Sequence, residues 1–248
     1  MYREATAMEV VNVSDAFVNT IDKDKAAMAL QAVWDYHALY APLREDEVRY
    51  VQGIKHLIKE TGRVAYMLDL GLYYAKKEKH DLAYRYWKMA ADLGDQASLL
   101  CLGDMWYEGQ FVERDYKKAF EMFNNISRCC QGSILRTKAL VRMAKMWRDG
   151  KGVPMDLGRY REMMKKLEHI YRTDHVYQDE NSAWFATELL YLLAEYKIEE
   201  DEIEEAVSFL ELAKKTLIKR SLEKTPSGSE QKWMEKVTAL LYTLERRR

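Results

Sequence analysis

The chain has 248 residues, of which 48% are hydrophobic and 32% charged. It contains 17 Tyr and 6 Trp but only three Pro, a composition typical of a soluble helical protein because proline is costly inside helices. Lys and Arg number 39 against 40 Asp and Glu, and this balance argues against a nucleic-acid binder, which usually carries a basic surface.

The cysteines and the apolar segments indicate where we expect the protein to act. Two of the three Cys are adjacent and make no disulfide framework, so a reducing compartment is the simpler context. The N-terminal residues lack the charged and then apolar pattern of a signal peptide, and no apolar run reaches the roughly 18 residues of a membrane span. We therefore expect a cytoplasmic protein with no membrane contact.

The first 62 residues are predicted to hold a lead-in segment and one helical hairpin. Residues 1–21 combine a β-prone Val run with a candidate cap at Ser14, so their structure stays open. Apolar residues at helical spacing predict helices over about 22–40 and 45–60. Pro42 separates the two helices and Gly62 is a candidate C-cap for the second, so residues 22–62 form the predicted hairpin.

Residues 63–170 contain three copies of one pattern. Each copy has a small residue with an aromatic residue three positions later, namely Gly71 with Tyr74, Gly103 with Trp106 and Ala144 with Trp147. In the second and third copies a Gly, a Val and an Asp follow at +6, +9 and +12 from the small residue. This periodicity predicts helix–loop–helix repeats, with a loop four residues shorter in the first copy.

Each position of the pattern has a structural explanation. A small residue such as Gly103 lets the second helix of a pair cross close to the first, and the aromatic residue at +3 is expected to fill the core beside that crossing. Loop glycines permit positive φ, and Val153 is expected to fold back as an apolar plug. Asp115 and Asp156 are placed to cap the second helices of their repeats.

Residues 171–248 are predicted to form a further hairpin and a capping helix. A polar segment over 172–182 precedes a helix over about 183–196, with Asn181 or Ser182 as its candidate cap. Further helices are expected over about 203–220 and 230–247. The acidic run over 199–205 is expected to be a solvated turn and helix start, and a dock for a basic partner is the alternative.

The repeats resemble the Sel1-like repeat, a relative of the tetratricopeptide repeat. The segments LGDMWYEGQFVERDYKKAFEMF, MAKMWRDGKGVPMD and AYRYWKMAADLGDQA carry this resemblance. Phe111 replaces the second loop glycine of the family motif, and Ala144 replaces its first glycine. The resemblance implies an all-α, right-handed superhelical solenoid of antiparallel helix pairs, in which residues 63–170 are Sel1-like repeats and residues 171–248 a tetratricopeptide-like hairpin with its capping helix.

The resemblance also implies a non-catalytic protein–protein interaction scaffold or adaptor, which binds a peptide or protein on the concave face made by the first helices of the repeats. The predicted partner-binding residues are the non-core positions of that face: Leu68, Leu72, Leu100, Asp104, Tyr107, Glu108, Val141 and Lys145. The alternatives are a peptide-sensing regulatory protein, an RNA-binding protein and an enzyme, and the neutral net charge argues against RNA. The identity of the partner and the oligomeric state stay open.

No motif predicts catalysis, a metal or a cofactor. The glycine loop over 149–156 lacks the Lys-Ser/Thr that completes a phosphate-binding loop. Cys129 and Cys130 lack the further ligands of a zinc site, so they are expected to be ordinary half-buried cysteines, with a redox role left open. None of the five His belongs to an HExxH motif. We therefore expect that the protein is not an enzyme and needs no cofactor.

Overall fold

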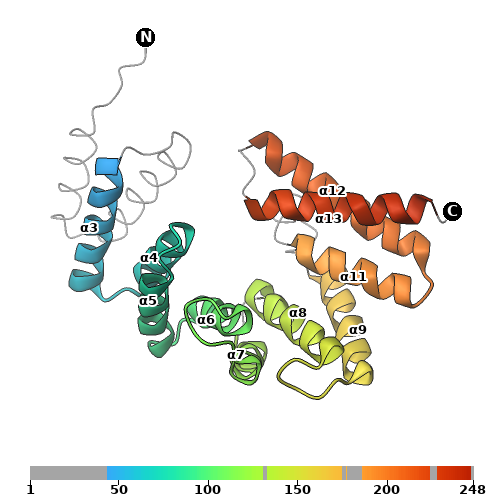
Figure 1. The fold of residues 1–248 in the computed structure, drawn as a ribbon, viewed down its shortest axis with the longest axis horizontal. Helices are drawn as coiled ribbons and strands as arrows, with labels where there is room; N and C mark the ends of the chain where they lie inside the picture. Colours follow the sequence, from blue (N-terminus) through green and yellow to red (C-terminus); the bar gives the residue numbers. More distant parts are fainter. Residues whose placement is uncertain (1–43, 131–132, 175–176, 178–185, 224–227, 247–248) are drawn as a thin grey trace, which may run out of the picture. The chain divides into compact units, whose positions relative to one another are not determined.

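The structure is a computed structural model that describes residues 44–130, 133–174, 177, 186–223 and 228–246 (Figure 1). The predicted lead-in segment, the predicted helix over 22–40 and the candidate caps Asn181 and Ser182 lie outside these residues. The chain divides into two compact units, residues 1–98 and 99–248. The four-part division expected from the sequence stays a prediction.

The described part of the first unit contains α3 (Arg44–Thr61), α4 (Val64–Lys76) and α5 (His80–Asp92), with α4 packed against both neighbours. Gly62 ends α3 with φ +62°, and its N–H donates to the Ile58 carbonyl oxygen at 2.9 Å, so the predicted C-cap is confirmed. Gly94, at φ +93°, likewise lies just after the end of α5. Asp95 then accepts a hydrogen bond from the N–H of Ser98 at 2.6 Å and starts the next helix.

The crossing of α4 and α5 depends on Gly71. A Cβ atom at this position would lie 2.3 Å from Nε1 of Trp87, whose ring fills the space that the missing side chain leaves. Ala83, one turn before Trp87 on α5, is fully buried in the same contact region. The prediction that a small residue permits a close helix crossing is confirmed here.

The second unit takes in most of α6 (Gln96–Glu108) and continues with six further labelled helices: α7 (Tyr116–Cys129), α8 (Ser133–Asp149), α9 (Leu157–Thr173), α11 (Thr187–Glu199), α12 (Ile203–Glu223) and α13 (Gly228–Glu245). Helix α8 packs against α7 and α9, and α12 packs against α11 and α13. Helix α11 also contacts α8, α9 and α13, so it joins the third repeat to the C-terminal helices.

The close crossing recurs along the second unit. A Cβ atom on Gly103 would lie 2.5 Å from Cε1 of Phe123, the residue that α7 places against α6. The corresponding positions of the next pair, Ala144 on α8 and Met164 on α9, are fully buried. Ala194 and Leu210 are likewise fully buried on α11 and α12, at the spacing of the first repeat, and the repeat pattern therefore extends to the C-terminal hairpin.

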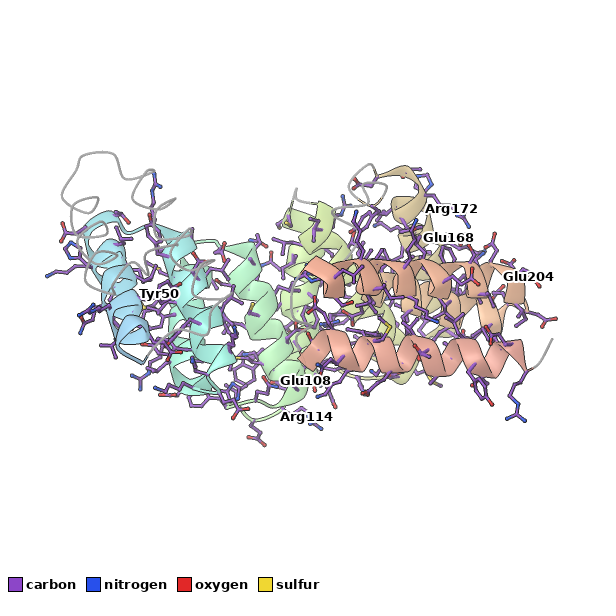
Figure 2. The ribbon with its side chains drawn as sticks, turned by 90° about the horizontal axis from the view of Figure 1, so that it is seen from above. Tyr50, Glu108, Arg114, Glu168, Arg172 and Glu204 are labelled. Atoms are coloured by element: carbon purple, nitrogen blue, oxygen red, sulfur yellow. The ribbon has the colours of Figure 1, made fainter. Side chains whose placement is uncertain are left out.

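The loops between paired helices are closed as their sequences predict. Asp115 accepts a hydrogen bond from the N–H of Lys118 at 3.0 Å, and Asp156 accepts one from the N–H of Arg159 at 2.9 Å. The backbone N–H of each Asp donates at 3.0 Å to the carbonyl oxygen of the tryptophan on the preceding helix. Arg114 adds a contact across the first of these loops, since its Nη2 donates to the carbonyl oxygen of Glu108 at 3.0 Å (Figure 2).

The loop glycines have two separate functions. Gly109 and Gly150 adopt positive φ angles of 72° and 66°, which a glycine adopts without steric cost. Gly152 has φ +73°, and in addition a Cβ atom there would lie 2.4 Å from the carbonyl oxygen of Tyr116, so this loop touches the start of α7. Phe111 adopts φ +65° at the position equivalent to Gly152, a left-handed conformation that costs a non-glycine residue about 1–2 kcal/mol.

Helix boundaries differ from the predictions mainly in the C-terminal region. Helix α11 continues to Glu199, three residues beyond the predicted end, because Lys197 and Ile198 still pack against neighbouring helices. Asp201, at φ +63°, then turns the chain into α12. The predicted all-α architecture of paired helices is confirmed throughout the described residues.

Candidate protein-binding face

Two of the eight predicted partner-binding residues lie in the first unit, on α4. Leu72 is exposed over 47% of its surface. Leu68 is half-buried one turn earlier. Both are placed where a partner can reach them, and their binding role stays a prediction.

The prediction that Leu100 and Val141 are non-core positions is wrong. Leu100 is only 8% exposed and packs in a cluster with Ala119 and Phe123, while Val141 is 2% exposed in the core around α9 and α11. Each lies three residues before the small residue of its helix, and therefore faces the same crossing as that residue. Neither side chain can contact a partner.

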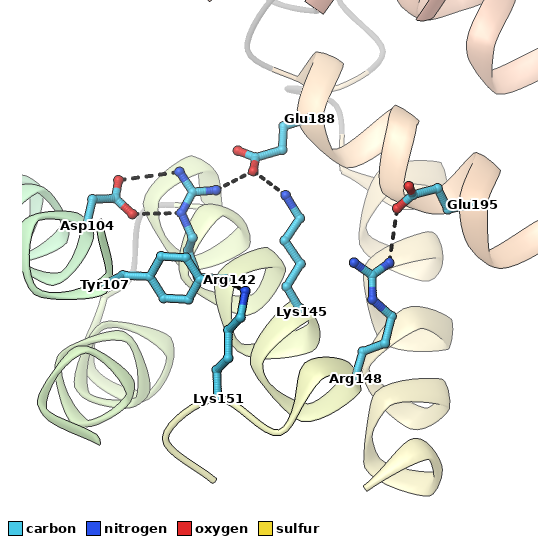
Figure 3. Close-up of polar contacts among 8 residues, drawn as sticks. All are labelled: Asp104, Tyr107, Arg142, Lys145, Arg148, Lys151, Glu188 and Glu195. Carbon is cyan, nitrogen blue, oxygen red and sulfur yellow. Dashed lines mark hydrogen bonds and ion pairs between the residues drawn. The ribbon is translucent and has the colours of Figure 1, made fainter. Parts of the chain in front are cut away.

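Asp104 on α6, Arg142 and Lys145 on α8, and Glu188 on α11 form one ion-pair network (Figure 3). Arg142 contacts Asp104 through Nε at 2.7 Å and Nη2 at 3.4 Å, and its Nη1 donates to Glu188. The Lys145 ammonium donates to the same Glu188 oxygen at 2.6 Å. Ion pairs thereby connect α6, α8 and α11, which are the first helices of three consecutive helix pairs.

The network shifts the pKa values of its members. Burial by itself would raise the pKa of the Glu188 carboxyl, but the positive charges of Arg142 and Lys145 outweigh burial and lower this pKa from 4.5 to about 2. For Arg142, burial opposes the charged form, whereas Asp104 and Glu188 raise its pKa above the usual range. Arg142 and Glu188 are therefore charged at neutral pH.

A second set of contacts continues the row toward the C-terminal end of α8 (Figure 3). Arg148 donates to Asp149 and to Glu195 of α11, each at 3.1 Å. Lys151 donates to the hydroxyl of Tyr107 at 3.2 Å. We call the six charged side chains that link α6, α8 and α11 the charge ladder: Asp104, Arg142, Lys145, Arg148, Glu188 and Glu195.

The charge ladder includes two predicted residues and four that the sequence analysis missed. Asp104 and Lys145 were predicted, and the structure connects them through Arg142 and Glu188. The helical spacing of Arg142, Lys145 and Arg148 along α8 is visible in the sequence and could have indicated a basic stripe. Glu188 and Glu195 have no comparable signal, because their position opposite α8 depends on how successive helix pairs are stacked.

The predicted residues Tyr107 and Glu108 lie at the end of α6. Tyr107 is half-buried, and its ring meets that of Tyr116 edge to face with centroids 5.2 Å apart. The Glu108 side chain is exposed. Together with the charge ladder, Tyr107 and Glu108 give the surface formed by α6, α8 and α11 charges of both signs and one aromatic side chain.

The acidic run after α11 is less solvated than the sequence suggests. Lys197, which is 8% exposed, contacts Glu202 at 2.6 Å, Glu205 at 2.8 Å and Glu168 of α9 at 3.3 Å. Although burial opposes its charge, these carboxylates raise the pKa of Lys197. Glu200 also contacts Arg161 at 3.5 Å, so at least three of the six acidic residues are paired within the chain and are less available to bind a basic partner.

Two of the predicted core tryptophans are only partly buried. Trp106 and Trp147 each carry a cation above the ring, with Lys118 Nζ at 3.6 Å and Arg159 Cζ at 4.6 Å from the respective centroids. Lys118 and Arg159 each lie three residues after the capping Asp of their helix, and each donates its backbone N–H to that Asp. Tyr74 and Trp87 are 5% and 6% exposed and are therefore core residues. Trp106 and Trp147 are only partly buried, so the prediction that they fill the core is correct for only part of each side chain.

The described residues contain no group of three or more His, Cys, Asp or Glu side chains arranged to hold a metal ion. None of the described helices combines the length and apolarity needed to cross a membrane. Cys101, Cys129 and Cys130 are in no disulfide, and Cys129 is exposed rather than half-buried as predicted.

Two known proteins match a short stretch of this sequence. The chain is 32% identical over 81 residues to the ERAD-associated E3 ubiquitin-protein ligase component HRD3B of Arabidopsis thaliana, and 31% identical over 81 residues to component HRD3A of the same plant. Each match covers 33% of this chain. The chain spans only 13% and 11% of the length of these relatives. No family model matches the chain.

The fold has a clear counterpart among solved structures. The Sel1 repeat protein from Oxalobacter formigenes aligns with a TM-score of 0.55 and 16% sequence identity, over 93% of this chain and 96% of that one. At this identity the likeness shows the fold alone. With the helix pairs, crossings and capped loops described above, the chain has the fold of the Sel1-like repeat proteins.

Proposed function

We propose that the protein is a non-catalytic interaction scaffold, whose second unit binds a peptide or protein segment over the face of α6, α8 and α11. The observation that carries this proposal is the charge ladder. Its side chains remain between 24% and 37% exposed, although each is held in an ion pair. A partner can therefore contact them without any helix having to move.

The chemistry of this face favours a peptide over a small anion or cation. Cations of α8 alternate with carboxylates of α6 and α11, so no charge of one sign is gathered in one place. A segment with its own alternating charges can match the ladder, while its apolar side chains contact Tyr107. Affinity then comes from several modest contacts, as is usual for repeat proteins.

The relatives support a role in assembly. HRD3A and HRD3B are described as components of an E3 ubiquitin-protein ligase, and a component that contributes surface needs no catalytic residues of its own. Only 81 residues are shared, so the partners of those proteins are not transferred to this chain. The proposed location is the cytoplasm, because the three cysteines form no disulfide framework.

The experiment is a quantitative capture of proteins from the native cell with the full chain as bait. A variant carrying Tyr107→Ala and Glu108→Lys is compared with a control carrying Glu211→Lys, an exposed carboxylate of α12 outside the ladder. We expect the double variant to lose the partners that the control retains, while circular dichroism verifies that both variants are folded. Equal capture by both variants, or recovery of RNA in place of protein, would contradict the proposal.

A further inference from the structure

We propose that the groove between α7 and α9 is a second interaction surface, which binds an acidic protein segment carrying apolar side chains. The groove lies over α8 and has a volume of about 560 Å³. No side chain of the charge ladder lines it. The groove is therefore separate from the charge ladder, and each of the two proposals can fail without the other.

The floor of the groove is apolar. Phe120 of α7 meets Trp147 of α8 edge to face, with ring centroids 5.5 Å apart. Met143 and Met163 complete the floor, and Met163 is only partly buried. Methionine and aromatic side chains adapt to the shape of an apolar group, and the volume lies within the roughly 300–1,000 Å³ typical of binding pockets. Apolar side chains of a partner can thus be buried here.

The walls of the groove carry an excess of positive charge. Arg159 lies above the Trp147 ring and is 3.5 Å from Asp156, while Lys166 is exposed and is in no ion pair found among the described residues. Lys117, three residues before Phe120, and Arg128, four after Asn124, extend this charge along α7 and are also unpaired among the described residues. Glu162 is the one acidic residue that lines the groove.

This combination fits a protein segment better than a nucleic acid. Arg159 covers the face of Trp147 on which a base would stack, and Glu162 repels phosphate groups at the wall. The net charge of the whole chain is −1, so the positive charge at the groove is a local feature of a nearly neutral chain. An amphipathic helix with apolar residues at i and i+4 can place them on the apolar floor of the groove. Carboxylates beside those residues can then pair with the cations of the walls.

The test uses the full chain and a fluorescent, end-blocked helical peptide that has Leu at i and i+4 positions and Glu between them. Binding is followed by fluorescence anisotropy for the unaltered chain and for the variants Lys166→Glu and Lys165→Glu. Both lysines are exposed on α9, but only Lys166 lines the groove. We expect Lys166→Glu to weaken binding about tenfold, and Lys165→Glu to change it by less than about twofold.

Three results would overturn the proposal. The first is no binding of the peptide up to about 1 mM, and the second is equal loss in the two lysine variants. The third is displacement of the peptide by single-stranded RNA at equal concentration, which would assign the groove to nucleic acid. Conversely, a peptide with Ser in place of Leu should bind about tenfold more weakly, because the apolar floor is then unused. Melting temperatures of the variants verify that both remain folded.

Discussion

The contact between the loop after α8 and the start of α7 can be tested with two glycines in the same loop. Gly150 and Gly152 have φ angles of 66° and 73°, so an alanine at either position incurs the same left-handed cost of about 1–2 kcal/mol. The surroundings differ. The nearest atom to an added Cβ is the Met155 Cβ at 3.3 Å for Gly150, but the Tyr116 carbonyl oxygen at 2.4 Å for Gly152.

The clash at Gly152 involves backbone and cannot be relieved by a side-chain rotation. Moving the loop away from α7 should add about 1–3 kcal/mol, the usual cost of overpacking. We therefore expect Gly150→Ala to lower the free energy of unfolding by about 1–2 kcal/mol and Gly152→Ala by about 2–5 kcal/mol. Urea titration followed by circular dichroism measures both values. Equal losses would refute the inferred contact between this loop and α7.

Three further predictions concern the repeat positions and the ladder. Asp156→Ala should lower the free energy of unfolding by about 1 kcal/mol because the cap of α9 is lost, and Asp156→Asn should restore most of it, as urea titration can measure. Gly71→Ala should melt at a lower temperature in a calorimeter, since its Cβ would overlap the Trp87 ring. Glu188, whose pKa is lowered from 4.5 to about 2, should stabilise the fold above pH 4.5, and this contribution should fade as the pH falls toward 2. Glu188→Gln should flatten that part of the stability profile, and an unchanged profile would contradict the role of Arg142 and Lys145.

The sequence predicts the features of this fold that are local. A small residue, an aromatic residue, a loop glycine and a capping Asp all act within one helix pair, so their spacing alone identifies Gly103, Gly109 and Asp115 correctly. The misplaced Leu100 and Val141 show where this reasoning fails. A shift of one or two positions along a helix decides whether a side chain faces the paired helix or the solvent, and the periodicity of an apolar helix such as α6 does not separate the two faces.

The candidate site could be predicted only in part, because it depends on contacts between helix pairs. Lys145 is identifiable as a polar residue on a first helix, but its partner Glu188 lies 43 positions away in the chain. That distance includes the whole of α9, and no local pattern indicates which residue of α11 will face α8. The same holds for Lys197, since its carboxylate partners come from α9 and α12.

The two proposed surfaces should respond differently to salt. A charged partner group at the charge ladder meets a side chain that already has an opposite charge beside it, so binding exchanges one ion pair for another. At the groove between α7 and α9, Lys117 and Lys166 form no such pair with described residues, and a partner carboxylate there adds a new one. We therefore expect affinity at the groove to fall steeply as ionic strength rises, because exposed charges are screened, and affinity at the ladder to change little. Similar salt dependence at both surfaces would mean that the internal ion pairs of the ladder do not persist when a partner is bound.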